Sequence, residues 1–172
     1  MASLPTIGRL NQLDDAAAQA ALAPLFEGAP SFVVRLLAQR PYRSWNELLD
    51  RAASIAARLP DHELVELINS HPRIGASPQS VSALSYREQG YDRDDGPAPL
   101  QEQLEQLNSA YEQRFGFRFV IFVAGRPRSE IAPLIGQRLA AGRDEEKQRA
   151  VTDILAIARD RLSSLSATEE GP

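Results

Sequence analysis

The stretch GFRFVIFVAGRP, residues 116–127, decides the fold class of this chain. Its aromatic and β-branched residues are typical of a β-strand. No second segment of the sequence has this pattern, so the stretch has no strand with which it could form a hydrogen-bonded ladder. We therefore expect one buried extended segment in an otherwise all-α protein. Its N–H and C=O groups must find partners among helix ends, water or a bound ligand.

The sequence on both sides of this segment is helical in pattern. Apolar residues recur at helical spacing between 100 and 115, and Gly116 is the expected stop. Ser44 and Glu47 have the spacing of a capping box at the start of another helix. We expect a single domain over 1–172, a bundle of about seven to eight helices with loose termini at 1–9 and 166–172. The helical patterns cover 14–26, 31–40, 44–59, 61–70, 99–115, 129–140 and 144–165.

The composition excludes several classes of protein. The chain has 172 residues and no cysteine, which rules out disulfides and thiolate chemistry. Its net charge of −4 argues against a nucleic-acid-binding domain. The longest apolar run, residues 119–124, is far shorter than the roughly 20 residues that a membrane span needs, and the N-terminus has no apolar signal core. We expect a cytoplasmic protein that binds neither nucleic acid nor membrane.

The stretch INSHPRIG, residues 68–75, places a histidine where a helix stops. Pro72 disfavours the helical conformation at His71, so the helix should end at or before that residue. One interpretation is a histidine that interacts with the helix dipole. The other is a general acid or base, because an imidazole titrates near neutral pH.

A polar stretch follows His71 and contains SYREQG, residues 85–90. Residues 71–99 are rich in Gly, Pro, Ser and Asp, and we expect a loop with at most one short helix; loops of this length are often functional. Ser85 and Glu88 have the spacing of a capping box, which would explain both residues structurally. Alternatively, a carboxylate from Glu88 against His71 would orient the imidazole and favour its protonated form, which would make it a proton donor.

Other candidate sites are weaker. No histidine pair has metal-binding spacing and no cysteine is present, so we expect no transition-metal site. Arg161 lies near the end of the apolar stripe of the last helix, where it is either an ion-pair partner or a substrate contact.

These segments, in this order, resemble the OHCU decarboxylases, the 2-oxo-4-hydroxy-4-carboxy-5-ureidoimidazoline decarboxylases of urate degradation. The resemblance runs from about Leu10 to Leu162, and its most specific motif is RFGFRFVIFV. It rests on RPYRSWNELL, HPRIG, SYREQG, LNSAYEQRFGFRFVIFVAGR, RL and IARDRL. Arg118 departs from the family, which usually has a smaller residue or proline there, and YDRDDGPAP, residues 91–99, has no good match.

The resemblance implies an all-α homodimer without metal or organic cofactor that converts OHCU to (S)-allantoin and CO2. It implies that His71 is the proton donor. Glu88 is the expected partner that orients and charges it. The implied substrate-binding residues are Pro72, Ser85, Gln89, Phe119, Val120, Ile121, Phe122, Val123 and Arg161.

Two alternatives of other classes stay open at this point. A helical interaction module would use the apolar stripe of the last helix, with His71 and Glu88 as capping residues. A related ureide hydrolase would need a group that activates water, and the sequence offers no obvious second base.

Overall fold

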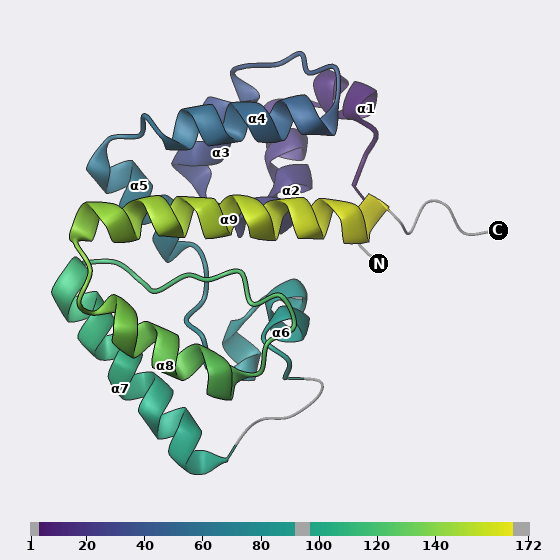
Figure 1. The fold of residues 1–172 in the computed structure, drawn as a ribbon. Coiled ribbons are helices and arrows are strands. Elements are labelled where there is room, and N and C mark those ends of the chain that lie inside the picture. Colours follow the sequence, from purple (N-terminus) through teal and green to yellow (C-terminus); the bar gives the residue numbers. More distant parts are fainter. Residues whose placement is uncertain (1–3, 92–96, 167–172) are drawn as a thin grey trace. The chain divides into compact units, whose positions relative to one another are not determined.

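The computed structural model describes residues 4–91 and 97–166 of the chain, and within these ranges it is all-helical, without a strand (Figure 1). The all-α prediction is confirmed. The helices are α1 (Ile7–Gln12), α2 (Asp15–Phe26), α3 (Pro30–Leu37), α4 (Trp45–Ala56), α5 (Asp61–Asn69), the 3₁₀ helix η1 (Pro78–Ser80), α6 (Ala83–Glu88), α7 (Ala98–Phe115), α8 (Arg128–Arg138) and α9 (Arg143–Ser166).

The chain divides into two compact units, one made of Met1–Ser70 with Ile154–Pro172 and the other of His71–Asp153. The single domain over 1–172 stays a prediction. Loose chain was predicted for 1–9, but Leu4 is buried and α1 begins at Ile7. Of the predicted loose terminus 166–172, only Ser166 lies in the described part, and much of the unmatched stretch 91–99, its residues 92–96, lies outside it.

The first unit is organised around α3. This helix packs against α2, α4 and α5, and α1 packs against α2. Phe26 and Phe32 meet edge to face in its core, with ring centroids 5.1 Å apart. Ser44 caps α4 as predicted, because its side chain accepts from the Glu47 N–H. The carboxylate of Glu47, however, accepts from the N–H of Arg43, one residue before the position that a capping box uses.

In the second unit, α7 and α8 pack against each other and the extended segment joins them (Figure 1). Gly116 ends α7 with φ of 78°, a left-handed conformation that glycine adopts without strain, as predicted. Residues 117–123 follow without helix or strand, and most of their side chains are buried. The buried extended segment is thus confirmed. Tyr111 contacts the rings of Phe115, Phe117 and Phe119, so aromatic rings join α7 to the extended segment.

A buried carboxylate supports the same aromatic core. Glu146 of α9 is 0% exposed and accepts from the hydroxyl of Tyr111 at 2.6 Å. Its other oxygen lies 2.6 Å from a guanidinium nitrogen of Arg149. Burial, and then the hydrogen bond to Glu146, raise the pKa of Tyr111, so the phenol stays a donor. These contacts attach the start of α9 to α7.

None of the helices in the described ranges has the length and apolar character needed to cross a bilayer.

Tyr111→Phe should lower the free energy of unfolding by about 1–3 kcal/mol, because a buried carboxylate then loses a donor. Urea denaturation followed by circular dichroism measures this. Tyr86→Phe is the matched control, since the Tyr86 hydroxyl makes only a long 3.4 Å bond to the Tyr91 carbonyl. Equal losses in the two variants would show that the Tyr111–Glu146 bond does not stabilise the core.

Candidate active site

His71 follows directly after a helix end. Helix α5 stops at Asn69 with Ser70 as its C-cap, in agreement with the restriction that Pro72 places on His71. The histidine side chain is 2% exposed. It is therefore an enclosed imidazole and not a solvated residue at a helix terminus.

The loop that begins at His71, residues 71–76, is anchored through its carbonyl groups; we call it the His–Pro loop. Five side chains from other parts of the second unit donate to these carbonyls. The donors are Arg118 to His71 at 3.1 Å, Gln89 to Arg73 at 3.0 Å, Asn108 to Ile74 at 2.9 Å, Gln101 to Gly75, and the Tyr91 hydroxyl to Ala76. A loop without regular structure thereby has its buried acceptors satisfied.

Gln89 joins the SYREQG motif to this loop. Its Nε2 donates to the Arg73 carbonyl, and its Oε1 accepts from the Gly75 N–H at 2.9 Å. The side chain is 6% exposed. The amide therefore holds the loop at two points, and its role as a substrate contact stays a prediction.

The capping interpretation of Ser85 and Glu88 is wrong. Ser82 is the N-cap of α6, and its hydroxyl accepts from the Ser85 N–H at 3.1 Å. Ser85 is instead a buried residue of the first turn, 2% exposed, and Glu88 is half-buried at the end of the same helix. Residues three apart share a helix face, so the hydroxyl and the carboxylate lie on the same side of α6.

Charged side chains fix the loop further. Arg73 forms a bidentate pair with Glu112 of α7, with Nε 2.7 Å from Oε1. The hydrogen bond to that carboxylate raises the pKa of Arg73. Arg118, the residue that departs from the family pattern, contacts the His71 carbonyl and so ties the extended segment to the loop.

The extended segment has protein partners for part of its backbone. The Phe122 N–H donates to Oδ1 of Asp153 at 3.1 Å. Arg126 donates to the carbonyls of Phe122 and Val123, at 2.6 and 2.9 Å. Gly125, with φ of 74°, closes the turn that brings Arg126 back. An α9 side chain and the arginine of the following turn therefore replace a strand partner for these groups.

The side chains of the segment differ in their surroundings. Phe119 is fully buried and meets Tyr111 edge to face at 5.2 Å, so its ring belongs to the core. Val120, Ile121 and Val123 are also buried, whereas Phe122 is half-buried. A substrate role for Phe119 is thus restricted to its backbone.

Arg161 is the one predicted site residue that belongs to the first unit. It is 2% exposed, its Nη2 lies 2.7 Å from a carboxylate oxygen of Glu27, and its Nη1 donates to the Pro24 carbonyl at 2.9 Å. It forms a buried ion pair that fastens α9 to the end of α2. The other predicted site residues all lie in the second unit.

Sequence reasoning missed the residues that hold the loop and the segment. Asn108 had one detectable signal, because it lies four residues after Leu104 and three before Tyr111, on the buried face of α7. A polar residue on such a face needs a buried partner. Gln101, Tyr91, Arg126 and Asp153 carry no comparable local signal, since their partners lie in other elements.

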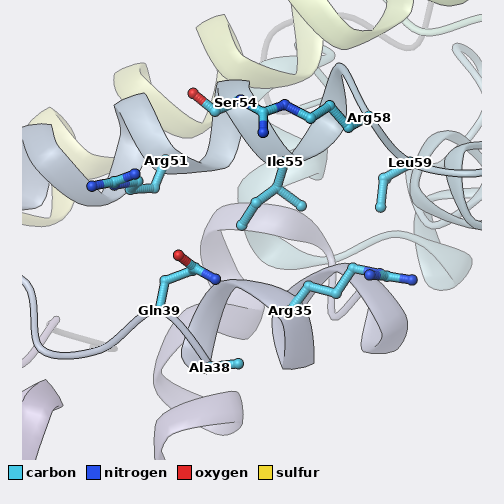
Figure 2. A pocket seen from close by; sticks show the side chains of 8 residues that line it. All are labelled: Arg35, Ala38, Gln39, Arg51, Ser54, Ile55, Arg58 and Leu59. Atoms are coloured by element: carbon cyan, nitrogen blue, oxygen red, sulfur yellow. The ribbon is translucent and has the colours of Figure 1, made fainter.

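A hollow lies in the first unit between α3 and α4 and has a volume of about 310 Å³ (Figure 2). Its lining includes Arg35, Arg51 and Arg58, and Ile55 points between the two helices. Arg35 pairs with Glu63 at 2.6 Å, which raises the pKa of the arginine. Guanidinium groups attract anions but do not release protons near neutral pH, so this hollow lacks the acid that the His–Pro loop offers.

The fold and the site define a class, an all-helical protein with a buried histidine on a loop anchored by side chains. A family model described as OHCU decarboxylase matches residues 11–163. The chain belongs to the OHCU decarboxylase family.

The sequence is also similar to individual proteins of known name. It is 32% identical over 170 residues to the uric acid degradation bifunctional protein PucL of Bacillus subtilis, a match that covers 96% of this chain and 33% of that protein. It thus spans about a third of that relative's length. It is 27% identical over 167 residues to the 2-oxo-4-hydroxy-4-carboxy-5-ureidoimidazoline decarboxylase of Haloferax volcanii, covering 95% of this chain and 98% of that protein.

Solved structures share the fold. The crystal structure of OHCU decarboxylase in the presence of (S)-allantoin matches with a TM-score of 0.68 and 20% identity, over 90% of this chain and 99% of that one. The crystal structure of (S)-allantoin synthase matches with a TM-score of 0.65 and 19% identity, over 94% of this chain and 54% of that one. At these identities the likeness concerns the fold alone.

Gly75→Ala should destabilise the protein more than Gly28→Ala. Both glycines have positive φ, 77° and 80°, so both substitutions carry the same backbone strain. Only at Gly75 does the added methyl meet other atoms, with Leu104 Cδ1 at 3.0 Å. We expect an additional loss of about 1–2 kcal/mol in the free energy of unfolding, measured in urea. Equal losses would mean that Leu104 moves aside freely.

Proposed function

We propose that this chain catalyses the decarboxylation of OHCU to (S)-allantoin and CO2 in urate degradation. The observation that carries the proposal is the joint placement of the family's motifs: Gln89, from SYREQG, bonds twice to the loop that presents the buried His71. Family membership and the names of the relatives support the same reaction.

The chemistry of this substrate suits a protein that supplies only position and a proton. Loss of CO2 leaves an electron pair next to the ring, and the adjacent C=N group receives it. The substrate therefore provides its own electron sink, the task for which other decarboxylases use a cofactor. Binding that holds the carboxylate out of the conjugated plane aligns the breaking bond with this sink, and such orientation is worth several kcal/mol.

His71 is the proposed proton donor; it either protonates the new carbon directly or shuttles the proton from the substrate hydroxyl. General acid catalysis contributes about 10²–10⁴-fold to a rate. Delivery from a fixed imidazole reaches one face of the intermediate only, which accounts for a single enantiomer of allantoin. Glu88 is proposed to orient the imidazole and to favour its charged form.

The remaining predicted residues would hold the substrate. Ser85 would offer a hydroxyl, and Pro72 would line the substrate pocket beside His71. Gln89 keeps one donor hydrogen and one acceptor lone pair beyond its two bonds to the loop, so it can hold the loop and contact a ligand together. Backbone groups of residues 119–123 would bind the ureido and ring carbonyl groups. Arg161 would offset the substrate carboxylate, in addition to its pair with Glu27.

The homodimer and the cytoplasmic location that the resemblance implies stay predictions. Light scattering on the purified chain measures the first and fractionation of the source cells the second.

His71→Gln should lower kcat by about 10²–10⁴-fold and abolish the optical activity of the product. The assay generates fresh substrate with uricase and hydroxyisourate hydrolase and follows allantoin by circular dichroism. His62→Gln is the matched control, since His62 is the other histidine of the chain and is exposed on α5. Optically active allantoin formed at the wild-type rate by the His71 variant would refute the assignment.

Glu88→Gln should reduce kcat less than loss of the imidazole and should move the alkaline limb of the pH–rate profile to lower pH. The physical reason is that a neutral amide no longer favours the protonated imidazole. Steady-state rates measured from about pH 6 to about pH 9 report the shift, because an imidazole titrates near neutral pH. A reduced rate with an unmoved profile would assign Glu88 to substrate binding rather than to His71.

A further inference from the structure

Asp153 of α9 has a place in the site that neither the motifs nor the proposed mechanism uses. Its Oδ1 accepts from the Phe122 N–H at 3.1 Å, in the middle of the segment proposed to bind substrate. Its Oδ2 lies 3.4 Å from Nη2 of Arg138 at the end of α8. Both side chains are 19% exposed, so this pair is largely enclosed. The two oxygens of one carboxylate thus connect two helices to the extended segment.

Arg138 contacts the segment at a second point. Its guanidinium carbon lies 5.1 Å from the centroid of the Phe119 ring, and its Nη1 lies 3.9 Å from the buried carboxylate of Glu146. The ring of Phe119 and the amide of Phe122 therefore each contact one member of the same ion pair. We call Asp153 and Arg138 the segment clamp.

The clamp determines the direction of a peptide group. In a planar trans peptide the N–H of one residue and the C=O of the residue before it point in opposite directions. With the Phe122 N–H directed at Asp153, the Ile121 carbonyl points away from Asp153. Arg126 fixes the next peptide in the same manner, because it holds the Phe122 carbonyl and so turns the Val123 N–H away from itself. One acceptor and one donor are thereby set in fixed directions two residues apart.

We propose that Asp153 is a positioning residue, which sets the peptide between Ile121 and Phe122 so that the segment presents its backbone to a ureide in a fixed orientation. The inference rests on the proposed function for the identity of the ligand. It also reduces the set of groups available to that ligand, since the Phe122 N–H, the Phe122 C=O and the Val123 C=O already have protein partners. The charged pair acts through the backbone and does not touch the reacting atoms.

Asp153 is a favourable position for substitution. It lines a hollow of about 470 Å³ together with Arg138, Glu145, Gln148, Arg149 and Thr152, so its truncation leaves no new void in a packed core. Asp153→Asn keeps an acceptor oxygen and loses the charge. Asp153→Ala loses both. Asp160→Ala is the matched control, because Asp160 is an exposed aspartate of the same helix.

The experiment measures kcat and KM of each variant together with hydrogen exchange at the Phe122 amide by NMR. We expect Asp153→Ala to raise KM about tenfold and to expose the Phe122 amide to exchange, because a hydrogen bond to a charged acceptor is lost. Asp153→Asn should keep KM within about threefold of wild type and keep the amide protected. Asp160→Ala should change neither. If the alanine variant does not fold, Asp153→Glu, which displaces the carboxylate by one methylene, should raise KM in its place.

Two results overturn the proposal. One is rapid exchange at Phe122 with unchanged KM and kcat, which would make the clamp purely structural. The other is an equal loss of substrate binding in the asparagine and alanine variants, which would assign the effect to charge rather than to the peptide. A wild-type chain without activity on OHCU would refute the proposed function instead, and the exchange measurement would still report whether Asp153 holds the peptide.

Discussion

The second unit depends on the hydrogen bonds that side chains donate to the carbonyls of the His–Pro loop. A loop that is neither helix nor strand has no internal way to satisfy its backbone, and a buried carbonyl without a donor costs on the order of 1–3 kcal/mol. Here the donors are an arginine, two glutamines, an asparagine and a tyrosine. Because they come from α6, α7 and the segments beside them, the position of His71 depends on how these elements pack.

The extended segment obeys the same constraint with other partners. The N–H and C=O of Phe122 form hydrogen bonds with Asp153 and Arg126. Charged side chains thus provide the hydrogen-bond partners that a neighbouring strand provides in a sheet. Side-chain partners differ from a strand in one respect. A strand occupies every group along one edge, whereas a few side chains occupy chosen groups and leave others for a ligand. An isolated extended segment is therefore a suitable surface for a small molecule with both donors and acceptors.

The sequence predicted the fold better than the site. Long helices were recognisable because many residues repeat the same period, and α7 ends at Gly116 as predicted. The six-residue helices α1 and α6 are too short for a period to be seen. In α6, the serine that caps is Ser82 rather than Ser85, and the two have equal intrinsic preference for that position. Only the folded chain decides between them.

The candidate site residues were predicted from the resemblance to the family. The side chains that hold the His–Pro loop in place could not be predicted from it. The donor to the Gly75 carbonyl lies 26 residues along the chain, the donor to Ile74 lies 34 and the donor to His71 lies 47. No local pattern encodes contacts of this range. Arg118 looked like a departure from its family, yet it donates to the carbonyl of the proposed proton donor.

Residues that look unfavourable in isolation lie together in the second unit. Asn108 is a polar residue on a buried helix face, Gly75 has a positive φ, and the segment around Phe122 has strand character without a strand partner. A sequence consistent with stability alone would avoid all three. Each of them holds or forms irregular backbone next to His71 or within the segment proposed to bind substrate. The proposed reaction needs one proton and a fixed substrate orientation, and backbone held by side chains suits it, because geometry rather than a reactive cofactor then lowers the barrier.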